Sequence, residues 1–201
     1  MRQELLIGIT ESGVMHTDAD PPISLDTKFQ MVKESGVYDY FDKTPPLELE
    51  DDYRRCSEKY ELPILAGGWF YVLGRDEDLL MENLRLGARL GSLVHNTQIM
   101  MDHQDGSLVS DEQVVEIYLR AYETGEACGC RPTFEVHVNM WSEDFRRIEK
   151  VADLVEKQRI PFRMTLDHSH VIFKIDNPRE QEVFNIRESI ENGDLVLDPF
   201  R

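Results

Sequence analysis

The sequence has 201 residues, of which 41% are hydrophobic, and its 39 acidic and 22 basic side chains give a formal net charge of −17. Length and composition fit a single folded domain over residues 1–201 and argue against intrinsic disorder. The acidic charge and the lack of a Lys/Arg cluster argue against a nucleic-acid partner, because such binding needs a basic surface that neutralises phosphates.

Apolar runs and cysteines bear on localisation. No run of about 18 apolar residues predicts a transmembrane helix, and the first nine residues are too few and too strand-like for a signal peptide. The odd cysteine count, from Cys56, Cys128 and Cys130, does not indicate a disulfide framework. We therefore expect a cytoplasmic protein with no membrane partner.

Strand-like and helix-like segments alternate along the chain. Apolar runs bounded by turn residues predict strands at about residues 4–9, 37–41, 63–67, 93–99, 133–138 and 162–167. Segments with helical spacing follow them at about residues 27–35, 47–60, 76–90, 110–126, 142–158 and 180–191. Gly36 is expected to end the first helix, and the run Ser142-Glu143-Asp144 is expected to cap the start of the fifth.

This alternation predicts an α/β protein with a parallel sheet, because consecutive strands joined through helices run in the same direction. Polar residues follow most of the predicted strands, which favours a (β/α) TIM-barrel-like fold whose strand ends share one mouth. A doubly wound sheet would concentrate its chemistry at one switch point, and neither GxGxxG nor GxxxxGK[ST] occurs. With about six β/α units, the predicted barrel is incomplete.

Carboxylates and imidazoles gather at the ends of the fifth and sixth predicted strands. Glu135 and His137 are two residues apart on one strand, and Asp167 and His170 follow the next strand. Together these side chains suit a divalent ion such as Mn²⁺, Co²⁺, Mg²⁺ or Zn²⁺. The simpler interpretations are a buried Glu–His pair, an aspartate that forms a turn and a histidine on a surface loop.

Beside His137, three further residues are candidates for substrate binding. His95 lies on the fourth predicted strand, and it either faces the substrate or packs in the core. Trp69 and Trp141 follow the third and fifth strands, and their aromatic faces could stack on the CH faces of a sugar. Ordinary core packing is the alternative for both tryptophans.

The Glu-x-His strand of Glu135 and His137, followed about 30 residues later by the Asp-x-Ser-His run of Asp167 to His170, resembles the xylose isomerase-like TIM barrels. That superfamily includes sugar isomerases, sugar epimerases, inosose dehydratases and abasic-site endonucleases. The resemblance implies that Glu135 is both a metal ligand and the catalytic acid/base, that Asp167 is a second ligand, and that His170 binds metal or substrate. The family's ligands on strands seven and eight have no counterpart here.

The resemblance implies a metal-dependent isomerase or epimerase for a sugar, sugar phosphate or inosose. The metal would polarise an oxygen, and Glu135 would move a proton at the adjacent carbon. With so few ligands, we expect the metal site to be empty or partly filled, and the close carboxylates Glu135 and Asp167 to raise the pKa of their pair. The alternatives are a non-catalytic barrel-derived binding protein and an abasic-site endonuclease, which the acidic charge disfavours.

The missing last two β/α units also bear on assembly. We expect this sequence to be a truncated form of a longer barrel, whose first and sixth strands would leave open edges. Open edges and apolar surface favour a homodimer, and the alternative is that the chain's own last helix fills the gap.

Overall fold

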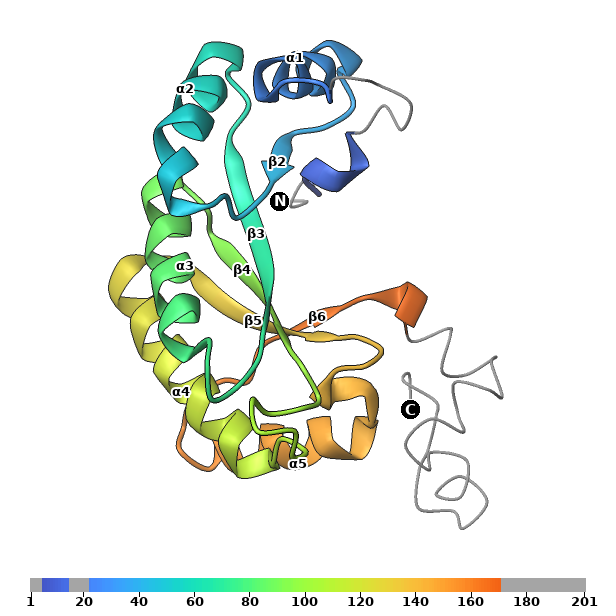
Figure 1. Ribbon diagram of the computed structural model, residues 1–201, viewed down its shortest axis with the longest axis vertical. Coiled ribbons are helices and arrows are strands. Elements are labelled where there is room, and N and C mark those ends of the chain that lie inside the picture. Colours follow the sequence, from blue (N-terminus) through green and yellow to red (C-terminus); the bar gives the residue numbers. More distant parts are fainter. Residues whose placement is uncertain (1–4, 15–21, 171–201) are drawn as a thin grey trace. The chain divides into compact units, whose positions relative to one another are not determined.

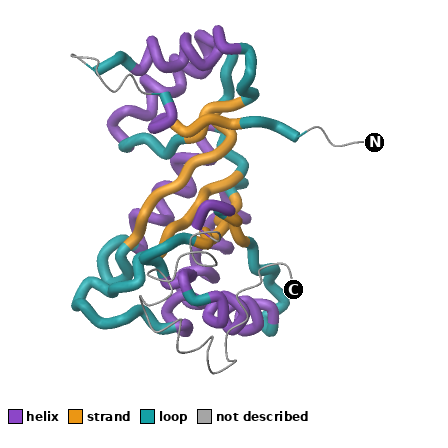
Figure 2. Tube along the Cα trace, turned by 90° about the vertical axis from the view of Figure 1, so that its right-hand side faces the viewer, coloured by secondary structure: helices purple, strands orange, loops and turns teal. Residues whose placement is uncertain are grey.

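The computed structural model describes residues 5–14 and 22–170, and in this part of the chain strands and helices alternate (Figure 2). Six described strands form one sheet, and strands that are consecutive in the chain are neighbours in the sheet (Figure 1). They are β1 (Gly8–Thr10), β2 (Tyr40–Asp42), β3 (Ile64–Tyr71), β4 (Val94–Ile99), β5 (Arg131–Val136) and β6 (Met164–Leu166). The prediction of an incomplete TIM-barrel-like α/β fold with six parallel strands is confirmed, because a doubly wound sheet would reverse its strand order.

Five α-helices and three short 3₁₀ turns are described. The helices are α1 (Leu25–Ser35), α2 (Glu50–Tyr60), α3 (Glu77–Leu90), α4 (Asp111–Cys128) and α5 (Phe145–Glu156). The 3₁₀ turns are η1 (Glu11–Gly13), η2 (Leu47–Leu49) and η3 (Trp141–Glu143). No helix of the described residues is long and apolar enough to cross a membrane. The predicted helix at 180–191 lies outside the described residues.

Helix ends follow local capping chemistry. The Ser24 hydroxyl accepts a hydrogen bond from the backbone N–H of Thr27 at 3.1 Å and so caps the start of α1. Gly36 ends α1 with φ +63°, as the sequence predicts, since glycine adopts this left-handed conformation without strain. Within the predicted cap Ser142-Glu143-Asp144, Asp144 is the residue that caps α5, whereas Ser142 and Glu143 belong to η3.

The first strand begins later than its apolar run predicts. Leu5 to Ile7 precede the ladder and are exposed, and β1 pairs with β2 through Gly8 opposite Tyr40. A Cβ atom added to Gly8 would lie 2.2 Å from the Tyr40 ring. A larger residue at Gly8 would therefore require the end of the Tyr40 side chain to move.

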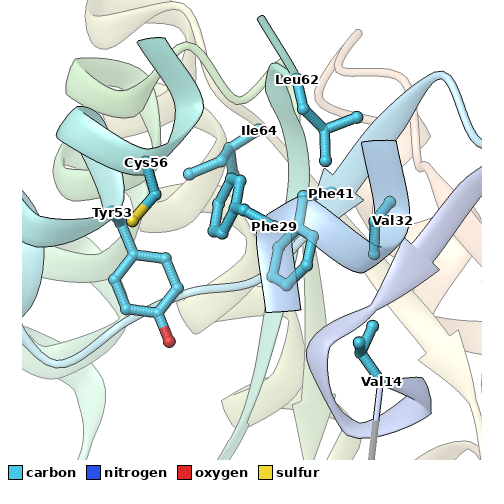
Figure 3. Close-up of a cluster of buried hydrophobic side chains, with 8 residues drawn as sticks. All are labelled: Val14, Phe29, Val32, Phe41, Tyr53, Cys56, Leu62 and Ile64. Carbon is cyan, nitrogen blue, oxygen red and sulfur yellow. The ribbon is translucent and has the colours of Figure 1, made fainter. Parts of the chain in front are cut away.

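The described chain clusters into two compact units. The first comprises Met1–Trp69, Met81–His95 and Glu123–Arg131, and the second comprises Phe70–Leu80, Asn96–Tyr122 and Pro132–Arg201. In the core of the first unit, the rings of Phe29 and Phe41 stack at 4.4 Å (Figure 3). The core of the second unit gathers Tyr118, Phe134 and Trp141, all fully buried. The prediction of one domain over residues 1–201 stays a prediction.

Candidate active site

Glu135 is a buried carboxylate on β5, in the second unit. Its side chain is 6% exposed, and it lies opposite Thr165 of the neighbouring strand β6. One carboxylate oxygen, Oε2, accepts a hydrogen bond from Asn96 Nδ2 at 2.7 Å and another from Gln98 Nε2. Asn96 and Gln98 are two residues apart on β4, so the pleat of the strand turns both amides towards the same face.

His137 follows β5 and stands between two other rings. Its centroid is 3.6 Å from that of His170, at an interplanar angle of 38°, and 5.9 Å from that of Phe70 in an edge-on arrangement. The Nδ1 atom is 2.6 Å from the carbonyl oxygen of Val138. Because a carbonyl can only accept, Nδ1 carries the proton, and in the neutral ring Nε2 is then the acceptor.

Asp167 follows β6 and closes the turn that carries His170. Its Oδ1 atom accepts hydrogen bonds from the Ser169 backbone N–H at 2.8 Å and the Ser169 hydroxyl at 2.6 Å. Its Oδ2 atom is 3.6 Å from His170 Nε2. The structure thus brings Asp167 and His170 together as the sequence predicts, and it also gives Asp167 the turn-forming contacts of the simpler interpretation.

The pKa values at this turn differ from the sequence-based expectation. Burial alone would raise the pKa of Asp167, but hydrogen bonds from Ser169 and the nearby His170 outweigh it and lower that pKa. For Asp167, the expected rise from a close like charge is therefore wrong. The pKa of His170 is also lowered, first by burial and then by the neighbouring His137, with Asp167 opposing.

The residues predicted to bind a metal do not form a ligand set within the described part of the chain. Across residues 5–14 and 22–170, no three His, Cys, Asp or Glu side chains gather in a way that could hold a metal ion. Two amide N–H groups point at Glu135 Oε2, and three N–H or O–H groups point at Asp167 Oδ1. These donors occupy one oxygen of each carboxylate, Oε2 of Glu135 and Oδ1 of Asp167, and leave the other oxygen of each to further partners. Metal binding stays a prediction.

The three predicted substrate-binding residues outside this cluster have different environments. His95 is 1% exposed, its Nδ1 is 3.3 Å from the Thr44 hydroxyl, and burial lowers its pKa to about 3. It lies on the opposite face of β4 from Asn96. Trp141 is fully buried in η3 and packs edge-on against Phe134, whereas Trp69 is 45% exposed near the end of β3. Of these three, only Trp69 presents its ring to solvent.

Three residues of the cluster are absent from the sequence-based candidates. Asn96 and Gln98 carry the amides that hold Glu135, and Phe70 packs against His137. Alternation along the predicted strand at 93–99 already places Asn96 and Gln98 on one face and His95 on the other. That signal identifies the two amides as a pair, but it does not identify their partner on another strand.

Comparison with known proteins supports the fold. No protein-family model matches the sequence, and no curated protein is significantly similar to it. An AP endonuclease of family 2 from Brucella melitensis superposes with a TM-score of 0.65 and 13% identity, over 90% of this chain and 76% of that chain. The 3-keto-D-glucoside 4-epimerase YcjR from E. coli gives 0.63 and 13%, over 96% and 77%.

A third solved structure, a xylose isomerase domain protein from Planctomyces limnophilus, gives a TM-score of 0.60 at 10% identity, over 90% of this chain and 70% of that chain. At identities this low, the likeness shows the fold and carries no activity from one protein to another. The described β/α units therefore have the fold of the xylose isomerase-like TIM barrels, as the Glu-x-His and Asp-x-Ser-His motifs predict.

Proposed function

We propose that this protein is an isomerase or epimerase that moves a proton at a carbon atom of an uncharged sugar, with Glu135 as the base. The observation that carries the proposal is the state of the Glu135 carboxylate. It is 6% exposed, its Oε2 atom is held by two amide groups, and within the described residues it pairs with no Lys or Arg. A buried carboxylate without a cationic partner is costly for folding, and such groups concentrate at functional sites.

The chemistry follows from one carboxylate and two imidazoles. Glu135 takes the proton from a carbon next to a carbonyl group, so that the C–H bond breaks and its electron pair forms the C=C bond of an enediolate. The π electrons of the carbonyl group move onto its oxygen, which takes a proton from the imidazolium form of His137 or His170. For isomerisation, the neutral imidazole then takes the proton of the neighbouring hydroxyl group as the new carbonyl forms. Return of the proton to the neighbouring carbon gives an isomer, and return to the same carbon from the other face gives an epimer.

Charge and surface favour an uncharged substrate. In the described part of the chain, Glu135, His137 and Asp167 make no ion pair with Lys or Arg, the side chains that usually bind phosphate. The net charge of −17 repels anions. Phe70 is 46% exposed beside His137, and its ring offers an apolar face to the CH groups of a sugar. A neutral ketose or inosose therefore fits better than a sugar phosphate.

Two of the solved structures with this fold are consistent with such chemistry. One is the 3-keto-D-glucoside 4-epimerase, and another is described as a sugar phosphate isomerase/epimerase from Parabacteroides distasonis, with a TM-score of 0.58 and 12% identity. Those activities belong to those proteins. Support for this chain comes from the contacts of Glu135.

Proton exchange with solvent tests the proposal. We expect the protein to incorporate deuterium from D₂O into at least one member of a panel of neutral ketoses, 3-keto sugars and inososes, as followed by NMR. Glu135→Gln should abolish the incorporation, and Thr97→Val on the opposite face of β4 serves as the control. Absence of incorporation across the panel, with and without added Mn²⁺, would contradict the proposal.

The same panel separates the alternatives. A non-catalytic binding protein would bind a sugar saturably without any deuterium incorporation, and an endonuclease would nick an abasic duplex. Metal binding is tested by titrating Mn²⁺ into the wild type and into Glu135→Gln combined with Asp167→Asn. If both bind with equal affinity, these residues are not metal ligands.

A further inference from the structure

Asn96 and Gln98 form an amide pair on β4 that contacts Glu135 twice. Nδ2 of Asn96 donates to Glu135 Oε2 at 2.7 Å, and Nε2 of Gln98 donates to the same oxygen. The other oxygen, Oε1, takes no hydrogen bond from the residues that the structure describes. Both donors therefore hold one oxygen of the carboxylate and leave the second for another partner.

The Asn96 amide makes this contact at a cost. Its Oδ1 atom is buried and has no hydrogen-bond partner within the described residues. An unpaired buried carbonyl oxygen destabilises a fold, and an apolar side chain of the same shape would avoid that loss. The reverse orientation of the amide would turn its oxygen against the carboxylate, so Glu135 fixes which way Asn96 points. What the asparagine contributes at this position is therefore its N–H donor to Glu135, and its carbonyl group contributes nothing within the described residues.

We propose that Asn96 and Gln98 are positioning residues that orient Glu135 for proton transfer. Two hydrogen bonds to a charged oxygen are strong and directional, so they restrict the rotation of the carboxylate and direct Oε1 towards the substrate. The two amides are neutral, whereas a Lys or Arg partner would draw electron density from the Glu135 carboxylate and make it a weaker base. The inference rests on the proposed function of Glu135 and adds the group that keeps its geometry.

Variants of the amide pair test the role. Gln98→Met and Asn96→Leu keep the approximate shape of each side chain and remove the N–H donors. The matched control is Thr97→Val, which lies between them on the other face of β4 and whose hydroxyl has no partner in the described part of the chain. With the substrate identified by deuterium incorporation, we expect kcat to fall about 100-fold in Gln98→Met and Asn96→Leu, with KM changed less than about threefold.

Stability separates positioning from a structural role. We expect the Tm of Asn96→Leu to fall only slightly, because removal of the unpaired oxygen partly offsets the loss of the N–H donor to Glu135. A lower Tm in both amide variants, with kcat per folded molecule unchanged, would overturn the proposal. A rise in KM with kcat retained would also overturn it, since the amides would then bind substrate. An equal loss of kcat in Thr97→Val would show general damage to β4 and would overturn it as well.

A spectroscopic measurement keeps the inference testable without a substrate. In ¹⁵N-labelled protein, the side-chain amide signals of Asn96 and Gln98 are assigned by their loss in the two variants. Both signals should move upfield in Glu135→Gln, where a neutral acceptor replaces the carboxylate, and should stay in place in Thr97→Val. If neither moves, the amides do not hold Glu135. If both move but no sugar exchanges deuterium, the contact is real and the proposed function is the part that fails.

Discussion

Two carboxylates, a partly buried one in the first unit and a buried one in the second, are held in opposite ways. Glu11 of the first unit pairs with Lys28 Nζ at 2.6 Å and Lys43 Nζ at 2.9 Å, and accepts a hydrogen bond from the Tyr53 hydroxyl at 2.9 Å. Glu135 of the second unit has two neutral amide donors and, within the described residues, no Lys or Arg. Glu11 directly follows β1 and Glu135 lies near the end of β5, so both occupy a similar place in their β/α units, and that place alone does not decide how the carboxylate is held.

The difference indicates what each carboxylate does. Burial alone would raise the pKa of Glu11, but Lys28, Lys43 and Tyr53 outweigh it and lower that pKa to about 2. With its charge neutralised and its oxygens occupied, Glu11 is an anchor that joins β1, α1 and α2. Glu135 lacks this compensation and keeps one oxygen open, which suits a base and adds little to stability.

The largest expected effect is on activity. Glu135→Gln should reduce deuterium incorporation by about 1,000-fold or more, because general base catalysis typically contributes a factor of roughly 100 to 10,000. Glu11→Gln should leave the activity per folded molecule unchanged. NMR exchange rates, normalised to the folded fraction from circular dichroism, measure both. Equal losses in the two variants would remove the distinction between them.

The next effect is on stability. Glu11→Gln leaves two lysines without their partner, and we expect a loss of about 2 kcal/mol in the free energy of unfolding, below the value for a fully buried pair because the lysines are partly exposed. Urea unfolding at pH 7 measures it. The exposed pair of Arg55 with Asp52 is the control, and Asp52→Asn should change the free energy by less than about 0.5 kcal/mol.

The pH dependence of stability follows from the same anchor. The pKa of Glu11 is about 2 in the folded protein and 4.5 as the ordinary value, so its stabilisation is fully present above pH 4.5 and is lost as the pH falls towards 2. The difference in unfolding free energy between the wild type and Glu11→Gln should shrink over that range. Urea unfolding at pH 7, 5, 4 and 3 tests it, and a difference that stays constant would contradict the ion-pair explanation.

The sequence predicts the fold more fully than the site. The alternation of apolar runs predicts the six strands in their order, and the glycine after a helical segment predicts Gly36 as a helix end. Both features depend on residues that are close together in the chain. The contact between Asp167 and His170 is predicted for the same reason, since both belong to one turn. Ser142 is predicted as a helix cap, but its hydroxyl instead donates to the backbone oxygen of Glu135, seven residues earlier.

The amides that hold Glu135 could not be predicted in the same way. Asn96 and Gln98 precede Glu135 by 39 and 37 residues, and their contact depends on the arrangement of β4 beside β5. Neutral amides are also common in turns, so their type gives no signal of function. His95 is a predicted substrate-binding residue, yet it lies on the other face of β4, buried against Thr44.

The smallest effect concerns the substrate surface. Phe70 is 46% exposed and packs edge-on against His137, so Phe70→Ala should raise KM by about three- to tenfold through the loss of roughly 1 kcal/mol of ring contact. Its kcat should change little, because the ring carries no group that transfers a proton. Leu108, 66% exposed in a loop of the same unit, provides the control as Leu108→Ala. An unchanged KM in Phe70→Ala would place the sugar elsewhere.

The most direct test of the difference between the two carboxylates needs no substrate. The free energy of unfolding of Glu135→Gln is measured by urea at pH 7 beside that of Glu11→Gln and the wild type. We expect Glu135→Gln to be as stable as the wild type or more stable, because a neutral amide replaces a buried charge that has no cationic partner in the described part of the chain. A loss as large as that of Glu11→Gln would show that Glu135 is also a structural anchor, and the functional assignment of Glu135 would be wrong.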